Sequence, residues 1–259
     1  MIIDSHCHLQ DEKYIDDIDQ VIKNATDSGV KKLICIGTSL DDSKEAIKIA
    51  EKFPEVYAVI GIYPHESVPN SDFRLELEEL SANKKVVAIG ECGLDYTNMD
   101  KPETNSKEVQ KELFRKQLGL AVQLGLPVVI HNREADEDTI FELSRYKETQ
   151  KLRGVFHCFT QNLELAKKVI DLGFYISFTA IITYPSAKHL VEVAKNIPRE
   201  KVLIETDAPY LPPQTERGKR NEPKNVRIVA EKLAEIWGIS VEEVAKITTK
   251  NASTLFSLN

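Results

Sequence analysis

The segment MIIDSHCHL, residues 1–9, places two histidines directly after a short apolar run at the start of the chain. Seven later segments contain a similar short apolar or β-branched run, and longer amphipathic stretches separate them. Such alternation predicts repeated βα units around a parallel sheet. The predicted strands cover residues 2–3, 32–36, 56–60, 86–89, 127–130, 154–156, 174–177 and 201–204. Predicted helices cover residues 14–28, 41–52, 106–124, 134–146, 163–172 and 187–196.

The number of predicted strands favours one architecture. Eight strands in about 250 residues are typical of a (β/α)8 barrel, whereas a doubly wound sheet of this size usually has about five to seven. We therefore expect an α/β protein with the TIM-barrel fold. Pro223 suits the first turn of an additional helix that reaches about Trp237, and Ser240 begins a capping-box pattern for a last one. Because no linker marks a boundary, residues 1–259 are predicted to form a single domain with extra C-terminal helices.

Composition restricts the classes of partner. The 259 residues are 42% hydrophobic, which is enough to bury a sizeable core. The net charge of −7, from 41 acidic and 34 basic residues, excludes nucleic-acid binding by bulk charge, so an anionic substrate needs local basic side chains. No apolar run approaches the roughly 20 residues that cross a bilayer, which predicts a cytoplasmic protein with no membrane contact. No apolar face stands out beyond the core patterns, which predicts a monomer.

Reactive side chains gather at the carboxyl ends of the predicted strands, where barrels build active sites. They are His6, His8, His65, Glu91, His131, His157, Glu205 and Asp207. Because strand side chains alternate between faces, His6 and His8 are expected to point inward together while Cys7 points outward. Burying so many imidazoles and carboxylates is costly unless a cation neutralises them. These ligand types predict zinc, manganese or nickel, and magnesium only in an oxygen-rich site.

The number of candidate ligands exceeds what one tetrahedral ion requires. Two divalent ions bridged by a carboxylate are therefore expected, with Glu91 as the bridge. His65 follows its strand by a few residues and is predicted to contact substrate rather than metal. The remaining histidine, His189, falls in an amphipathic stretch and is expected to have no catalytic role.

Ordered motifs along essentially the whole chain resemble those of the TatD-like metal-dependent hydrolases, a branch of the amidohydrolase-type barrels. The motifs are DSHCHL (4–9), GIYPH (61–65), GECGLDY (90–96), PVVIHNR (127–133), FHCF (156–159), ETDAPYL (205–211) and RNEP (220–223). The resemblance implies that one ion is held by His6, His8, Glu91 and Asp207 and the second by Glu91, His131 and His157. It also implies that Glu205 and His65 are site residues beyond these ligands.

The resemblance further implies phosphodiester hydrolysis by a metal-dependent deoxyribonuclease that acts on DNA ends, with related members acting on RNA or on D-aminoacyl-tRNA. Two ions suit this chemistry because they polarise the scissile phosphate, activate water and stabilise the leaving oxygen. Asp207 or Glu205 is expected to accept the proton of the attacking water. His65 is expected to protonate the leaving group or bind phosphate. Arg133 and Arg220 are predicted to bind substrate phosphates.

Other functions are compatible with the same sequence features. A D-aminoacyl-tRNA deacylase or a small-molecule ester or phosphate hydrolase would apply the same metal chemistry to another substrate. A non-enzymatic scaffold with structural zinc is disfavoured, because structural sites are closed and four-coordinate and the ligands here exceed four. The polymerase-and-histidinol-phosphatase barrels also begin with HxH but need further early histidines. None occurs between His8 and His65.

Overall fold

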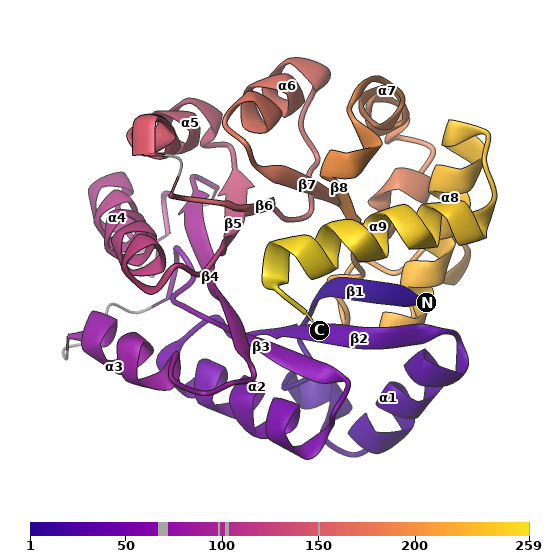
Figure 1. Ribbon diagram of the computed structural model, residues 1–259, viewed down its shortest axis with the longest axis horizontal. Helices are drawn as coiled ribbons and strands as arrows, with labels where there is room; N and C mark the ends of the chain where they lie inside the picture. The colour runs from indigo at the N-terminus through magenta and orange to yellow at the C-terminus, as the bar shows by residue number, and fades with distance from the viewer. Residues whose placement is uncertain (67–71, 98, 102–103, 150, 259) are drawn as a thin grey trace.

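The computed structural model describes residues 1–66, 72–97, 99–101, 104–149 and 151–258. Within these ranges, eight parallel strands pair in chain order and form a nearly closed barrel surrounded by helices (Figure 1). The strands are β1 (Ile2–Cys7), β2 (Val30–Ile36), β3 (Val56–Ile60), β4 (Val86–Asp95), β5 (Val128–Arg133), β6 (Gly154–Phe156), β7 (Tyr175–Phe178) and β8 (Val202–Ile204). The predicted TIM-barrel fold is confirmed.

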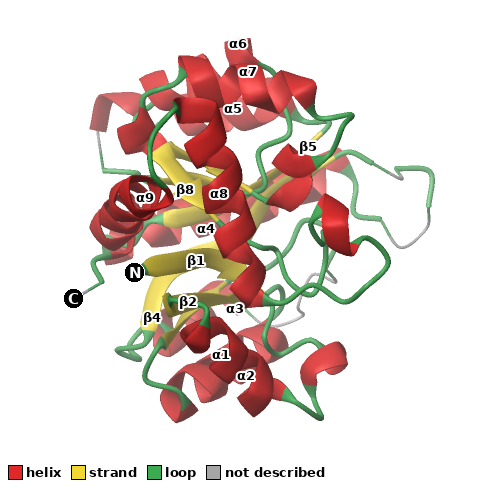
Figure 2. Cartoon of the chain, turned by 90° about the vertical axis from the view of Figure 1, so that its right-hand side faces the viewer, coloured by secondary structure: helices red, strands yellow, loops and turns green. Residues whose placement is uncertain are grey.

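Helices cover the outside of the strands (Figure 2). The α-helices are α1 (Ile18–Asp27), α2 (Leu40–Lys52), α3 (Phe73–Leu80), α4 (Lys107–Leu124), α5 (Asp136–Ser144), α6 (Leu163–Asp171), α7 (Lys188–Asn196), α8 (Val226–Trp237) and α9 (Val241–Phe256). Short 3-10 turns are η1 (Glu12–Tyr14), η2 (Lys147–Thr149), η3 (Ala180–Thr183), η4 (Arg199–Lys201), η5 (Gln214–Glu216) and η6 (Pro223–Asn225). No helix in the described ranges is long and apolar enough to cross a membrane.

Helix ends follow the capping signals in the sequence. The Ser240 hydroxyl accepts the Glu243 amide hydrogen at 3.2 Å, and the Glu243 carboxylate accepts the Ser240 amide hydrogen at 3.0 Å. This confirms the predicted capping box at the start of α9. The predicted helix at Pro223 begins instead as the 3-10 turn η6 and becomes α-helical at Val226, where α8 starts.

The last helix seals one end of the barrel. Apolar side chains inside the barrel form a cluster with the final turns of α9, including Leu255 and Phe256. The Asn251 amide on α9 also donates to the carbonyl of Val202, at the beginning of β8, at 2.8 Å. Figure 1 shows α9 lying across β1 and β8. Because α9 occupies the end at which these strands begin, the polar residues that follow the strands gather at the opposite end.

The contact between β1 and the segment after β8 closes the barrel. The amide of Asp207 donates to the His6 carbonyl at 2.9 Å, and the amide of His8 donates to the Ala208 carbonyl at 2.7 Å. Beneath them, the buried Asp4 carboxylate accepts both the amide and the hydroxyl of Thr206. Residues separated by about 200 positions along the chain are thereby held side by side.

Strand β4 is longer than predicted. The sequence places the strand end at residue 89, with Glu91 just beyond it, whereas the structure continues β4 to Asp95. Its pairing with β5 shifts register between Ile89 and Cys92, and the amide of Glu91 donates to the carbonyl of Gly37 at 3.1 Å. Such irregularities re-aim side chains next to functional sites. Glu91 therefore lies inside β4, whereas the sequence analysis placed it at the end of this strand.

Candidate metal centre

A cavity of about 400 Å³ opens at the carboxyl ends of the strands. It is lined by His8, Gln10, Asp11, Thr38, Asp42, Tyr63, Glu66, Glu91, His131, His157, Asp207 and Tyr210. Its volume falls in the range of about 300–1,000 Å³ that is typical of small-molecule sites.

Three side chains from the barrel-closing contact form a first group of metal-ligand atoms. The Nε2 atoms of His6 and His8 lie 3.2 Å apart, and each lies 3.4–3.5 Å from the Asp207 Oδ1 atom. The Nδ1 atom of His8 lies 3.0 Å from the Ile36 carbonyl oxygen, which can only accept a hydrogen bond. In the neutral ring this contact leaves the His8 Nε2 lone pair directed at the group.

A second group lies beside the first. The Glu91 Oε1 atom is 2.7 Å from His131 Nδ1 and 2.9 Å from His157 Nε2, and these two nitrogens are 3.2 Å apart. In both groups the possible ligand atoms lie within 4.8 Å of one another. These are the residues that the sequence interpretation assigned to two ions, and the fold brings all of them together.

Glu91 joins the two groups. Its Oε1 atom faces His131 and His157, whereas its Oε2 atom lies 3.5 Å from His6 Nε2 in the first group. The side chain is buried, so no large body of water screens its charge. One carboxylate oxygen is thus presented to each set of neighbours, which is the arrangement that a bridging ligand requires.

Burial and close charges together shift the pKa values of these groups. Burial opposes ionisation of Glu91, but the neighbouring histidines outweigh it and hold the pKa of the carboxyl well below its ordinary value. Burial likewise opposes protonation of His8 and His131, but carboxylates beside them raise the pKa of both rings. For His6, burial dominates and lowers the pKa. The site therefore favours negative carboxylates that attract positive charge.

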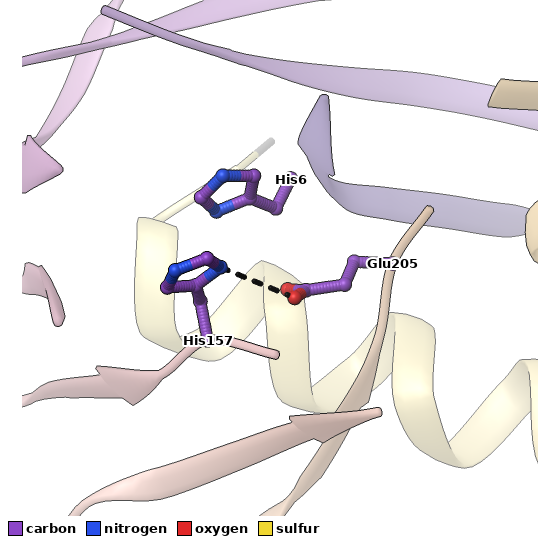
Figure 3. A group of neighbouring side chains, drawn as sticks. All are labelled: His6, His157 and Glu205. Carbon is purple, nitrogen blue, oxygen red and sulfur yellow. Dashed lines mark ion pairs between the residues drawn. The ribbon is translucent and has the colours of Figure 1, made fainter. Parts of the chain in front are cut away.

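Glu205 lies behind the cavity. It is fully buried, its Oε1 atom accepts the amide hydrogen of Cys158 at 2.6 Å, and the same oxygen lies 3.5 Å from His157 Nδ1. Figure 3 shows this contact, with the His6 ring stacked on the His157 ring. Glu205 is not among the described residues that line the cavity. This placement favours orientation of His157, and proton transfer by Glu205 stays a prediction.

His65 lies at the edge of the site, with its Nε2 atom 3.6 Å from the Asp95 carboxylate. Asp95 was not identified as a site residue in the sequence, although it is buried and lies 3.1 Å from His131 Nε2. The signal was available, because Asp95 is four residues after Glu91 and shares its face of a strand. It was missed because the predicted strand ended too early. The roles assigned to His65 stay predictions.

The two predicted phosphate-binding arginines differ in their surroundings. Arg133 is exposed at the end of β5. The Arg220 guanidinium donates to both carboxylate oxygens of Asp17, at 2.8 and 2.7 Å, and stacks on the Tyr14 ring. Arg220 is thus engaged within the chain and is not among the described residues lining the cavity. Its role in substrate binding stays a prediction.

Two further sequence expectations concern residues outside the ligand groups. The exposed His189 ring lies 2.9 Å from the Thr160 carbonyl through its Nε2 atom, away from both groups. Cys7, which was expected to point outward from β1, lies in the hydrophobic core between the barrel and its helices, as does Cys92 on β4. Their outward orientation agrees with the alternation along β1 and β4.

Comparison with known proteins supports a shared ancestry over the full chain. A family model described as TatD related DNase matches residues 3–257. The uncharacterised metal-dependent hydrolase YabD of Bacillus subtilis is 42% identical over the whole of both chains. The uncharacterised metal-dependent hydrolase YcfH of Escherichia coli is 38% identical over all of this chain and 96% of its own length.

Solved structures show the same relationship. The crystal structure of YjjV, a TatD homologue from Escherichia coli, matches with a TM-score of 0.91 and 31% identity, covering 100% of this chain and 98% of YjjV. A TatD family hydrolase from Entamoeba histolytica matches with a TM-score of 0.85 and 27% identity, covering 98% and 97%. With this fold, this cluster of imidazoles and carboxylates, and these relatives, the chain belongs to the TatD family of metal-dependent hydrolases.

Proposed function

We propose that the protein is a deoxyribonuclease that hydrolyses phosphodiester bonds at DNA ends with two divalent metal ions. Its proposed ligands are His6, His8, Glu91 and Asp207 for one ion, and Glu91, His131 and His157 for the other. The observation that supports this most directly is the orientation of Glu91, whose two carboxylate oxygens face different histidine groups. The mixed imidazole and carboxylate set suits zinc, manganese or nickel better than magnesium.

The residues fit two cations because imidazole nitrogens and carboxylate oxygens converge within each group. With the hydrogen of neutral His8 on Nδ1, its Nε2 atom faces His6 Nε2 and an Asp207 oxygen. Such buried acceptors repel one another unless a positive charge lies among them. Bound divalent ions supply Lewis acidity at the scissile phosphate and lower the pKa of a water molecule.

The roles of the protein groups follow from their exposure to the cavity. Asp207 lines the cavity and burial opposes its ionisation, but His8 and His6 outweigh this and lower the pKa of its carboxyl. It is therefore an ionised carboxylate placed to accept the proton of an attacking water. Tyr63 and Tyr210 also line the cavity and present ring surfaces to a terminal base.

End-labelled single-stranded DNA tests this proposal. Purified protein should shorten the strand progressively in the presence of manganese, zinc or magnesium, and EDTA or Asp207→Asn should abolish the product ladder. The exposed Asp171→Asn serves as the matched control and should leave the ladder unchanged. Metal-loaded wild-type protein that leaves DNA intact would rule out the deoxyribonuclease proposal.

A second candidate follows from the charge of the cavity wall. Among the described lining residues there is no lysine or arginine, whereas Asp11, Asp42 and Glu66 contribute carboxylates outside the proposed ligand sets. Such a wall suits a substrate whose cleaved end carries a cationic amino group more than one with several phosphates. D-aminoacyl-tRNA has this chemistry, since its ester is attacked next to an ammonium group. Deacylation of D-aminoacyl-tRNA without DNA cleavage would select this candidate.

Replacement of Arg133 tests how an anionic substrate is bound. Arg133→Ala should raise KM about tenfold, because a hydrogen bond to a charged group contributes about 1.5–3 kcal/mol. Metal content should not change, since the side chain is exposed and lies outside both ligand groups. The control is Arg145→Ala, another exposed arginine, whose guanidinium lies near Glu142 and away from the cavity. Loss of metal from Arg133→Ala would show that its role is misassigned.

Metal binding should release protons. Before metal binds, burial disfavours the charged forms of His8, His131 and His157, but neighbouring carboxylates raise the pKa of all three rings above its ordinary value. Protons therefore compete with a cation for the ring nitrogens, and metal affinity should fall as the pH is lowered through these raised pKa values. Calorimetric titration with zinc in buffers of different ionisation enthalpy should show net proton release near pH 7 and less at pH 9. A heat independent of the buffer would contradict this.

A further inference from the structure

Asp95 is the last residue of β4 and is surrounded by hydrogen-bond donors. Its Oδ1 atom accepts the Thr97 amide hydrogen at 2.9 Å and the Thr97 hydroxyl at 2.5 Å. Its Oδ2 atom accepts the Tyr63 hydroxyl at 3.0 Å and lies 3.1 Å from His131 Nε2. The Asp95 side chain is only 2% exposed, so these protein groups, and not bulk water, surround its carboxylate.

This carboxylate is one of two that flank the His131 ring, and it faces the nitrogen on the side away from Glu91. Glu91 lies 2.7 Å from Nδ1 and Asp95 lies 3.1 Å from Nε2, so a cation bound at Nδ1 leaves the ring hydrogen on Nε2, where the acceptor oxygen of Asp95 receives it. The unprotonated Nδ1 atom is the one that lies 2.7 Å from Glu91 and 3.2 Å from His157. Only an unprotonated ring nitrogen can bind a cation.

Asp95 is itself held firmly in place. Gln110, fully buried on α4, accepts the Asp95 amide hydrogen at 2.8 Å and donates to the Asp95 carbonyl at 2.8 Å. One amide side chain thus satisfies both polar backbone groups of this residue. With Thr97 bound to Oδ1, the carboxylate has little freedom to rotate away from His131, which is the rigidity that a supporting residue needs.

From these contacts we propose that Asp95 is a positioning residue that fixes His131 in the Nε2–H tautomer and so presents Nδ1 to a divalent cation. The inference rests on the ligand set proposed above. Glu205 and His157 show the mirror arrangement in the same site, because the carboxylate lies beside Nδ1 and leaves Nε2 facing Glu91. The Glu205 contact is the looser of the two, at 3.5 Å, and His157 Nδ1 has no hydrogen-bond partner among the described residues.

The substitution Asp95→Asn replaces a hydrogen-bond acceptor by a donor at the contact with His131 Nε2. The Thr97 amide can only donate, so the Asn oxygen should remain beside it and the new NH2 group should replace Oδ2. That group donates to His131 Nε2, which moves the ring hydrogen to Nδ1, the atom that faces Glu91. Nitrogen NMR of zinc-loaded protein labelled at histidine should show a zinc-bound Nδ1 and a protonated Nε2 for His131 in the wild type, and this pattern should be lost in the variant.

Zinc titration provides the second measurement. The wild type should bind two equivalents, and Asp95→Asn should bind the second about 10–100-fold more weakly, the usual effect of losing a partner behind a metal-binding histidine. Asp138→Asn is the matched control. Asp138 accepts the Tyr96 hydroxyl at 2.6 Å and pairs with Lys111, but does not belong to either ligand group. It should leave both the His131 tautomer and zinc affinity unchanged.

The outcomes separate this inference from the proposed function. A wild-type His131 with its hydrogen on Nδ1 would overturn the role of Asp95 even if the variant failed to fold. A folded Asp95→Asn protein with unchanged tautomer and zinc affinity would overturn it as well. A wild type with the expected tautomer that binds fewer than two zinc ions would support the control of His131 by Asp95 and overturn the two-metal ligand set.

Discussion

Glu91→Gln should reduce hydrolysis by about 10²–10³-fold and weaken the binding of both metal ions. The magnitude follows the scale for removing a group that stabilises charge in the transition state. The substitution preserves shape but removes the negative charge that lies among His6, His131 and His157. It also replaces one acceptor oxygen by an NH2 group, which cannot bind a cation. Turnover and metal content after equilibrium dialysis are the measurements.

Glu142→Gln is the control for this substitution. Glu142 is also a buried glutamate, but its carboxylate pairs with Arg115 on the outside of the barrel. Glu142→Gln should lower stability modestly while leaving metal content unchanged, because it weakens the charge-assisted hydrogen bonds to the partly exposed Arg115 and touches neither ligand group. Retention of more than about a tenth of the activity by Glu91→Gln would exclude its role as a bridge.

Gly93→Ala should destabilise the protein by more than about 3 kcal/mol, which is at the upper end of single-residue effects. Gly93 on β4 pairs with His131 on β5 and has a φ of +150°, a conformation that side chains rarely adopt. An added methyl carbon would overlap the His131 carbonyl oxygen. Relief of that overlap requires β4 and β5 to separate, which would also displace His131 from Glu91.

Gly119→Ala provides the matched comparison within the same molecule. Gly119 lies inside α4, and a methyl carbon added there meets no atom within 4 Å. Alanine in a helix interior is favoured over glycine by about 0.5–1 kcal/mol, so this variant should be more stable than the wild type. Urea unfolding measures both free energies. A Gly93→Ala protein within about 1 kcal/mol of the wild type would refute the close approach of β4 and β5.

Much of the fold could be predicted because its signals are local. Each apolar run becomes a strand, and the capping box at Ser240 forms as expected, since periodicity and caps depend on neighbours in sequence. Helix α3 (Phe73–Leu80) was missing from the predicted set. The extent of β4 was underestimated because residues 90–95 contain two glycines and two charged side chains, which interrupt the apolar run.

The candidate site was predictable for a similar reason. Histidines at strand ends must meet once the strands are parallel and close into a barrel, so His6, His8, His131 and His157 could be grouped without coordinates. What could not be predicted is how each polar atom is used. Arg220 was assigned to substrate phosphate, but the fold places Asp17 within its reach from 203 positions away in the sequence.

By itself, the sequence determined the barrel and the end at which the reactive residues gather, because periodicity and residue type are encoded locally, whereas the proposed ligand sets came from the family resemblance. Only the tertiary structure decided that Glu205 lies behind His157 and that Asp95 lies against His131 Nε2. The physical reason is that a hydrogen bond is gained or lost when the distance between its donor and acceptor changes by a few tenths of an ångström. Those distances are set by closure of the whole barrel and not by any single segment.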